Sequence, residues 1–473
     1  MVENDLPTVL ANEVGYGCVL FDGGQPGPGW ACVAGDEPRR IDGIDALGTG
    51  CLWLTNVPYD VMAVDGVGSN PWLRHDGYLR LRVEQIFGEW GLQDEPPDVC
   101  SGWLADLFDR VMRYAGALLP DQDWSKRTLV EEMASAWIEP EMPEEPYGEA
   151  MSRALRESIQ EWTRTPVRSP KGNITIKFWR PRMTHCQNVL AVPVPVGPWK
   201  LVAGNTLPPR GERMEWLTHD VTVPVLSNIV IQQDSVSDDL ALLFAFGGGA
   251  RDDQGYALRR SWCTHPELVA LNNLQPVEVD VAFLGSGYQQ IPPPKLDADA
   301  LEKLLSPIGA ASWSAGLVME NLWLAAARPA AIRTRSQNKR RRAVSYRGAW
   351  LRAHDRIICF TAAGQLFQRG WLVTGYGTGA IWVSVERENI GYLLHDAFAA
   401  GLVPSLQHIK DIPDIRSFTS GVDINRWGGA GETLIEALAR YSARGENLVV
   451  LDGLLDVDEE DVPGVLEGML VMD

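Results

Sequence analysis

"VLFDGGQPGPGWACV", residues 19–33, is the stretch that decides the N-terminal fold. Two apolar runs flank a turn made of Gly and Pro, a pattern that predicts a β-hairpin. Side chains alternate along a strand, so Trp30 and Cys32 share one face of the second strand and Ala31 lies on the other. Because both faces carry apolar residues, we expect a strand pair buried on both sides, with Trp30 mostly buried and the tip at 25–28 exposed.

The composition is that of a folded multidomain protein. The 473 residues are 45% hydrophobic and 22% charged, and this length predicts two or three domains. The formal net charge of −20 excludes a protein whose whole surface coats nucleic acid. Seven scattered cysteines predict reduced, mostly buried thiols and a cytoplasmic protein: Cys18, Cys32, Cys51, Cys100, Cys186, Cys263 and Cys359.

No segment of the sequence predicts contact with a membrane. The opening residues, MVENDLPTVL, lack the basic and apolar regions of a signal peptide. The most apolar segment, 306–331, is interrupted by Glu320 and Asn321. It therefore falls short of the ~20 unbroken apolar residues that a membrane span needs.

Two proline-rich stretches predict the domain boundaries. "IEPEMPEEPYGE" combines Glu with Pro and indicates an exposed linker, and "IPPPKLDAD" at 291–299 marks a second break. The predicted fold class is mixed, α/β or α+β. The predicted parts are an N-terminal α/β domain at 1–137, an acidic linker at 138–149, a strand-rich middle domain at 150–291, and a C-terminal mixed α/β domain at 295–473.

Hydrophobic periodicity predicts the main elements of these parts. Apolar residues at spacings of three and four predict amphipathic helices within 102–119 and 147–164. β-branched and apolar runs bounded by Gly, Pro and Asp predict strands instead. The expected strands lie at 173–179, 188–196, 199–204, 223–233, 241–248 and 277–285, and a strand meander is expected over 356–386.

A second Gly-rich turn, at 245–257, repeats the pattern of strand, Gly-rich turn and strand. This pattern resembles the phosphate loops of the actin and Hsp70 superfamily, and the RNase H-like nucleases keep a similar hairpin with a metal-binding Asp. The resemblance implies Mg²⁺ on Asp22 and phosphate near Gly23 and Gly24. The second turn departs from the pattern because Phe246 stands where the first turn has Asp22. We therefore interpret both turns as plain hairpins and keep the RNase H/actin-like enzyme, active or degenerate, as the alternative.

Other residue patterns do not predict catalysis. An RNase H-like nuclease would need further carboxylates beside Asp22, and the sequence offers Asp60, Asp65 and Glu84 without a spacing that brings them together. Zinc would require the His185–Cys186 pair to meet the segment 263–265 in the fold. We predict no catalytic residue and no metal or other cofactor, with Mg²⁺ expected only under the enzyme alternative.

The strongest anomaly is a basic segment at 328–356, where ten Arg and Lys residues stand against one acid, Asp355. Arginine binds phosphate in a forked geometry, and interleaved aromatic side chains stack on bases. The residues predicted to contact nucleic acid are Arg333, Arg335, Lys339, Arg340, Arg341, Arg342, Tyr346, Arg347 and Trp350. The competing interpretations are an exposed loop, and pairing with acidic surface of this chain or of a neighbouring subunit.

The C-terminal end offers an acidic counterpart. Five Asp and Glu residues lie close together, one at 456 and four at 458–461, and an apolar tail follows them. Complementary acidic and basic patches favour head-to-tail assembly. The same acids are also typical of the first turn of a helix, where they interact favourably with the helix dipole.

Together these observations predict a non-catalytic binding or assembly protein in a larger intracellular complex, such as a ribonucleoprotein, defence or mobile-element complex. Its expected partner is nucleic acid or an acidic protein surface, bound through 328–356. The two alternatives are the RNase H/actin-like enzyme and a self-associating, virion-like or filament subunit. No membrane partner is expected.

Overall fold

The computed structural model separates the chain into two compact units. Unit 1 comprises 1–138, 294–325 and 405–473, and unit 2 comprises 139–293 and 326–404. Residues 294–325 thus group with the N-terminal part, so the predicted C-terminal domain 295–473 is shared between the two units. The structure describes residues 14–64, 70–90, 92–119, 128–136, 148–158, 163–165, 169–180, 182–230, 239, 243, 251–252, 255–256, 262–274, 277–290, 308–328, 330–333, 340–343 and 345–404.

Both units mix helices with sheets, which confirms the predicted mixed fold class. Most of the predicted linker at 138–149 lies outside the described residues, and helix α5 begins at its end. The acidic stretch and apolar tail beyond residue 404 also lie outside them. In the part of the chain that is described, we find no helix with the length and apolar character of a membrane span.

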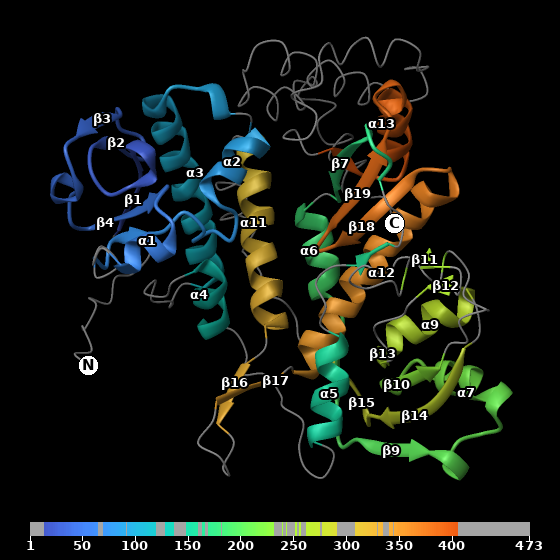
Figure 1. Ribbon diagram of the computed structural model, residues 1–473. Helices are drawn as coiled ribbons and strands as arrows, with labels where there is room; N and C mark the ends of the chain where they lie inside the picture. The colour runs from blue at the N-terminus through green and yellow to red at the C-terminus, as the bar shows by residue number, and fades with distance from the viewer. Residues whose placement is uncertain are drawn as a thin grey trace. The chain divides into compact units, whose positions relative to one another are not determined.

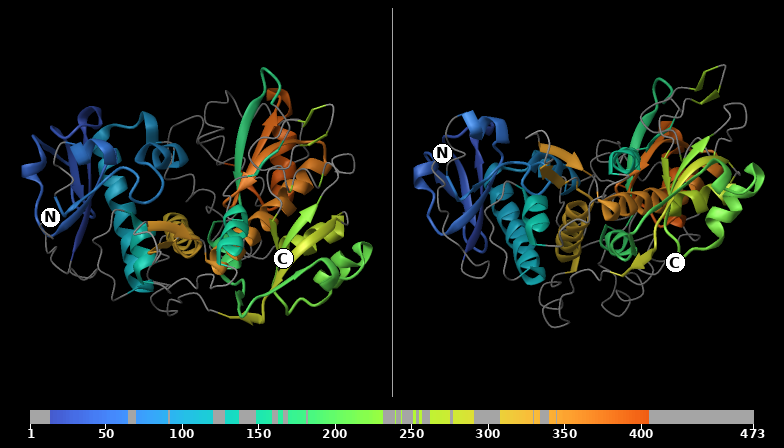
Figure 2. Two further views of the ribbon diagram at one scale, coloured as in Figure 1. Left: turned by 60° about the horizontal axis from the view of Figure 1, so that its bottom comes forward. Right: turned by 90° about the horizontal axis from the view of Figure 1, so that it is seen from below.

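Unit 1 is built on a five-stranded sheet in the order β3-β2-β1-β4-β5 (Figures 1 and 2). The first three strands form an antiparallel meander, and β4 and then β5 extend it in parallel. The strands are β1 (Gly15–Phe21), β2 (Gly29–Val33), β3 (Arg39–Ile41), β4 (Cys51–Thr55) and β5 (Leu73–Arg74). The helices are α1 (Tyr59–Val64), α2 (Val83–Trp90), α3 (Pro97–Leu118), α4 (Leu129–Ala136) and most of α11 (Ile308–Ala327).

The predicted hairpin exists as β1 and β2, and β1 is buried on both faces as expected. Val19 and Phe21 join a cluster around Trp53 on one face. On the other face Tyr16 meets the edge of Phe108 of α3, with ring centroids 5.7 Å apart. Trp30 is half-buried, and Arg40 lies 5.8 Å from its ring centroid.

Helix α11 contains most of the apolar segment at 306–331, and its two polar interruptions are buried in unit 1. Glu320 is paired with Arg80, and Asn321 donates to the carbonyl of Leu317 at 2.8 Å. Leu317 and Trp323 are fully buried around them. The helix is apolar because it forms part of a protein core.

Among its described residues, unit 2 contains two larger antiparallel sheets, three two-stranded sheets (β8 with β15, β11 with β12, and β16 with β17) and a long helix, α12 (Tyr346–Gln368). The five-stranded sheet has the order β20-β7-β19-β18-β6 and the four-stranded sheet the order β13-β10-β14-β9. The strands are β6 (Thr163–Arg164), β7 (Ile174–Trp179), β8 (Val194–Val196), β9 (Lys200–Ala203), β10 (Val225–Val230), β11 (Arg251–Asp252), β12 (Gly255–Tyr256), β13 (Trp262–Thr264), β14 (Glu278–Leu284), β15 (Gly287–Gln289), β16 (Ala330–Arg333), β17 (Arg340–Ala343), β18 (Leu372–Gly377), β19 (Ala380–Val385) and β20 (Val403–Pro404). The other helices are α5 (Gly148–Ser158), α6 (Arg182–Leu190), α7 (Arg213–His219), α9 (His265–Leu274) and α13 (Ile390–Ala399).

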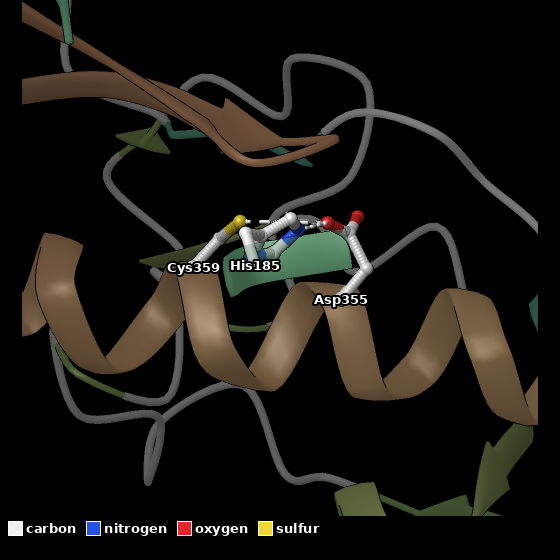
Figure 3. A group of neighbouring side chains, drawn as sticks. All are labelled: His185, Asp355 and Cys359. Atoms are coloured by element: carbon white, nitrogen blue, oxygen red, sulfur yellow. Dashed lines mark hydrogen bonds and ion pairs between the residues drawn. The ribbon is translucent and has the colours of Figure 1, made fainter. Parts of the chain in front are cut away.

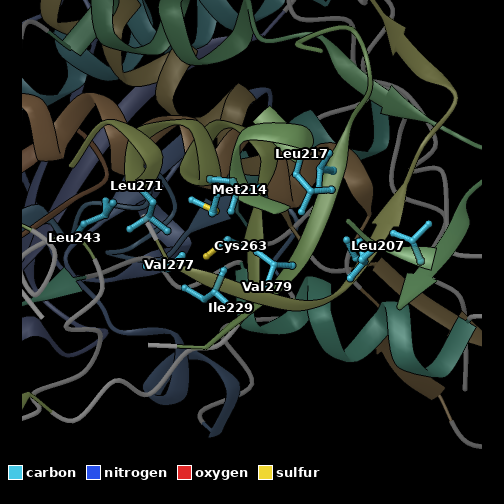
Figure 4. Close-up of a cluster of buried hydrophobic side chains, with 13 residues drawn as sticks. Leu207, Met214, Leu217, Ile229, Leu243, Cys263, Leu271, Val277 and Val279 are labelled. Carbon is cyan, nitrogen blue, oxygen red and sulfur yellow. The ribbon is translucent and has the colours of Figure 1, made fainter. Parts of the chain in front are cut away.

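The main cluster of the four-stranded sheet joins β10, β13 and β14 to α7 and α9 (Figure 4). Cys263 and Val279 are fully buried in it, and Met214 and Leu217 reach it from α7. The strands predicted at 199–204, 223–233 and 277–285 contain β9, β10 and β14 of this sheet.

Two predicted strand regions are confirmed only in part: the first ends in β8 and the second contains β18 and β19, but both begin as helix. Residues 188–190 belong to α6, and 356–368 belong to α12 instead of to the predicted meander. In α12, Ser345 caps the first turn by accepting from the amide of Gly348 at 3.0 Å. Residues 346–353 are all buried, and from Asp355 to Leu366 buried side chains recur every three or four residues. Tertiary packing on this face outweighs the β-preference of the local sequence.

The backbone around Gly29 leaves no room for a side chain. A Cβ there would lie 2.5 Å from the carbonyl oxygen of Leu20 and 2.9 Å from the Cα of Phe21. We expect Gly29→Ala to reduce the free energy of unfolding of unit 1 by about 1–3 kcal/mol. Gly27→Ala is the matched control, since its nearest atom would lie 3.9 Å away. Urea unfolding of the two variants checks the prediction, and equal midpoints would contradict it.

Candidate functional site

The basic segment forms two different structures within unit 2. Its first part is the hairpin β16–β17, in which Arg333 pairs with Arg340, Ile332 with Arg341, and Ala331 with Arg342 (Figure 1). The tip of this hairpin, with Arg335 and Lys339, lies outside the described residues. We call β16, β17 and the tip between them the basic hairpin, residues 330–343.

The second part of the segment is the start of α12, and there the prediction of surface contacts is wrong. Tyr346 and Trp350 are 4% and 1% exposed and pack in one hydrophobic cluster with Leu226 and Phe283. Their rings are therefore covered by the protein and are not available to stack on bases. Arg347 is also buried, and burial lowers the pKa of its guanidinium to about 10.

Arg356, farther along α12, is fully buried and forms an ion pair. Its Nη2 and Nε donate to Oε1 of Glu267 at 2.9 and 3.1 Å. Oε2 of Glu267 accepts from the amide and hydroxyl of Thr264. The pair joins α12 to α9, so this arginine belongs to the core of unit 2.

Asp22 lies on the surface of unit 1, at the start of a 3₁₀ turn from Asp22 to Gly24. Gly23 and Gly24 have φ angles of 63° and 67°, a conformation that suits glycine. Both carboxylate oxygens of Asp22 accept from Arg40, and this hydrogen bonding lowers the pKa of Asp22. A Mg²⁺ ion on Asp22 would have to displace this guanidinium.

The carboxylates expected to join Asp22 under the enzyme alternative do not form a group with it among the described residues. Asp60 is exposed on α1 and Glu84 on α2, whereas Asp65 lies outside the described residues. The second Gly-rich turn, at 246–249, lies outside them as well.

The structure gathers three chemically reactive side chains inside unit 2 (Figure 3). Asp355 and Cys359 lie one turn apart on α12, and His185 approaches from α6. His185 Nε2 lies 2.8 Å from Oδ1 of Asp355, and Sγ of Cys359 lies 3.6 Å from the same oxygen. All three side chains are buried.

Asp355 also fixes the turn between β18 and β19. Its oxygens accept from the amide of Thr378 at 2.8 Å and from the amide of Gly379 at 3.0 Å. Burial by itself raises the pKa of Asp355, but the hydrogen bond and charge of His185, the Thr378 amide and the charge of Arg352 outweigh it and hold the pKa below its usual range. The carboxylate is therefore ionised and hydrogen-bonded on several sides.

The three side chains form a hydrogen-bonded network with the chemistry of metal ligands. A histidine nitrogen, a carboxylate oxygen and a sulfur within 4.8 Å of one another resemble part of a zinc site. A structural zinc site requires four ligands, however, and no fourth His, Cys, Asp or Glu joins this group among the described residues. Burial and the charge of Asp355 raise the pKa of Cys359 well above its usual value, so the sulfur is a thiol rather than a nucleophilic thiolate.

The zinc grouping considered from the sequence does not form. Cys263 lies in the core cluster beneath the four-stranded sheet, and His265 Nδ1 lies 3.1 Å from the hydroxyl of Tyr288. His185 instead meets Asp355 and Cys359, which stand about 170 residues farther along the chain. Their spacing of four residues places them on one face of a helix, but the sequence there predicted strands.

A row of alternating tryptophan and basic side chains lies on the five-stranded sheet of unit 2 and was missed from the sequence. Lys177 Nζ lies 3.4 Å from the ring centroid of Trp179 and 5.6 Å from that of Trp382. Arg182 lies over Trp179 at 4.9 Å. We call Lys177, Trp179, Arg182 and Trp382 the Trp–cation row. It joins two strands that are distant in sequence, so only the sheet register reveals it.

Asp355 should be essential to the stability of unit 2. In Asp355→Asn an amide replaces an ionised oxygen that accepts from His185 and from backbone amides. We expect a loss of about 3–5 kcal/mol in urea unfolding, because a buried charge network loses its centre. The control is Asp280→Asn on β14, where Asp280 is 46% exposed, and its cost should stay below ~1 kcal/mol. Similar losses in the two variants would contradict a central role of Asp355.

Unit 2 should lose stability at mildly acidic pH through His354. Burial, together with the neighbouring charge of His185, lowers the pKa of His354 to about 4. The neutral imidazole is thus favoured in the folded state, so its contribution is complete above about pH 6.5 and disappears as the pH falls toward 4. The free energy of unfolding should fall by on the order of 3 kcal/mol over this interval. His354→Asn should flatten this dependence in urea titrations, and an unchanged slope would contradict the assignment.

Comparison with known proteins shows only a distant likeness in structure. No protein-family model and no curated protein matches the chain. Among solved structures, phi29 DNA polymerase complexed with primer-template DNA is similar at a TM-score of 0.41 and 10% identity, covering 78% of this chain and 80% of that chain. Phi29 DNA polymerase complexed with single-stranded DNA is similar at a TM-score of 0.39 and 10% identity, with the same coverage. At these values the likeness carries no functional assignment.

Proposed function

We propose that this chain is a non-catalytic binding protein of a larger complex and that it contacts nucleic acid through the basic hairpin. The observation that carries the proposal is the composition of the paired strands β16 and β17. Four of their eight residues are arginine, none is acidic, and Arg333 is paired directly with Arg340.

Like charges opposite each other destabilise an antiparallel pair. The hairpin therefore favours a polyanionic partner, whose charges offset this repulsion. Phosphate suits arginine especially well, since the planar guanidinium donates two parallel hydrogen bonds to it. Arg335 and Lys339 in the tip add two further basic residues by sequence.

The charge of the whole chain sets the expected form of this contact. A net charge of −20 repels nucleic acid from most of the surface, so binding depends on a local concentration of positive charge. Such a contact is strongly weakened by salt, because it releases counterions from the phosphates. We expect the basic hairpin to neutralise only a few phosphates. Its role would be to hold one nucleic-acid strand in place within an assembly.

Pairing of the basic hairpin with an acidic protein surface is the alternative that the same composition favours. The acidic stretch at 456–461 of this chain, or of a second copy, has the required chemistry by sequence. The two kinds of partner can be told apart by measurement. Pairing between copies of the chain changes the mass of the particle, whereas nucleic acid binding changes its absorbance.

Replacing Arg340, Arg341 and Arg342 together by Ala should weaken binding to a fluorescein-labelled oligonucleotide and flatten its salt dependence. Each phosphate contact that is lost should reduce the slope of log K against log salt by roughly 0.7–0.9. Fluorescence anisotropy at several salt concentrations measures both quantities.

The control variant replaces three exposed basic residues outside the hairpin, Arg82, Lys200 and Arg210, by Ala. It removes the same formal charge, so a general charge effect would flatten its salt dependence equally. Equal salt slopes for the two variants would overturn the hairpin proposal. A hairpin variant that changes only the oligomeric mass in light scattering would favour the acidic partner.

A further inference from the structure

The hydrogen-bond register of the basic hairpin divides its paired residues between two faces. Residues directly opposite each other in an antiparallel pair share a face, and successive residues along each strand alternate between the faces. Arg333 and Arg340 are opposite each other, so they lie on the same face. That face comprises Ala331, Arg333, Arg340 and Arg342, and the other face comprises Ala330, Ile332, Arg341 and Ala343.

The two faces differ in charge. Three of the four arginines in β16 and β17 lie on the first face, which we call the arginine face (Arg333, Arg340 and Arg342). The other face is apolar apart from Arg341. Because an antiparallel sheet commonly packs one face against protein and exposes the second to solvent, this distribution favours the arginine face as the one that meets a partner.

The aromatic side chains of the basic segment do not belong to the paired strands. Tyr346 and Trp350 are buried in a hydrophobic cluster of unit 2. The strands β16 and β17 contain only arginine, alanine and isoleucine. They therefore have the chemistry for phosphate contacts and lack the aromatic rings on which bases stack.

We propose that the arginine face binds the phosphate backbone of nucleic acid without reading its bases, and that Arg341 takes no part in the contact. Arg340 and Arg342 lie two residues apart on one strand, about 6.8 Å, and Arg333 lies on the adjacent strand about 4.8 Å away. A guanidinium group donates two parallel hydrogen bonds to one phosphate. Three arginines at this spacing therefore suit a backbone in which every nucleotide adds one phosphate.

Binding in the major groove of a duplex is the competing mode. That groove admits a two-stranded β-ribbon, and arginine binds guanine there by two hydrogen bonds. Such readout makes affinity depend on guanine content, whereas phosphate contacts carry no sequence information. The inference rests on the proposed contact of the basic hairpin with nucleic acid, and it specifies which arginines bind and which part of the nucleic acid they bind.

The test measures binding of the full chain to a fluorescein-labelled oligothymidylate and to two duplexes of the same length, one of A·T pairs and one of G·C pairs. Arg333→Ala, Arg340→Ala and Arg342→Ala should each reduce the slope of log K against log salt by roughly 0.7 for the single strand and 0.9 for the duplexes. Arg341→Ala is the matched control, because it removes the same charge from the same strand. It should leave the slope unchanged. The wild-type affinities for the two duplexes should differ by less than about fivefold, the minimum effect of one arginine–guanine pair.

A slope reduced as much by Arg341→Ala as by Arg340→Ala and Arg342→Ala would overturn the arginine face while leaving the hairpin proposal intact. A larger preference for the G·C duplex would show base readout and would overturn the inference in the same way. Unchanged slopes in all four variants would overturn both proposals. Arg340→Lys keeps the charge and should keep the slope, so a slope as low as that of Arg340→Ala would show that disruption of the hairpin is the cause and would overturn the arginine face.

Discussion

The buried carboxylate of Asp355 is the constraint on which the organisation of the five-stranded sheet depends. It lies on α12 and accepts from the amides of Thr378 and Gly379, the two residues between β18 and β19. Both have positive φ angles, 52° and 72°, as a two-residue hairpin turn with matching twist requires. Threonine rarely adopts this conformation, and the hydrogen bonds to Asp355 offset its cost.

The fixed turn determines what lies on the sheet. Gly379 accepts at its carbonyl from the amide of Arg180, which follows β7 directly, at 2.9 Å. The turn thus sets the register of β19 against β7, and with it the pairing of Lys177 with Trp382. A one-residue shift would move each of these side chains to the opposite face of the sheet. Asp355, on the helix α12 that covers one face of the sheet, therefore helps to determine which side chains lie on the opposite face.

The sequence predicted local features well and long-range groupings poorly. The hairpin at 19–33 and the amphipathic helix at 102–119, found as β1–β2 and α3, followed from alternation and from helical spacing, which are properties of a few neighbouring residues. The region of α12 was misread because Ile357, Ile358 and Phe360 favour strands locally, while the packing that makes it a helix comes from distant elements. Tyr346 and Trp350 were misplaced for the same reason, since a basic neighbourhood in sequence does not reveal which side chains enter the core. The Trp–cation row and the meeting of His185 with Asp355 depend on residues far apart in sequence.

The ion pair between Arg356 and Glu267 has a consequence for how this sequence can change over time. Both side chains are fully buried, and either one alone would leave an uncompensated charge in the core of unit 2. An apolar pair of similar volume is tolerated far better than either half-changed state. The two positions, on α12 and α9, are thus energetically coupled, so a change at one is tolerated best when the other changes with it.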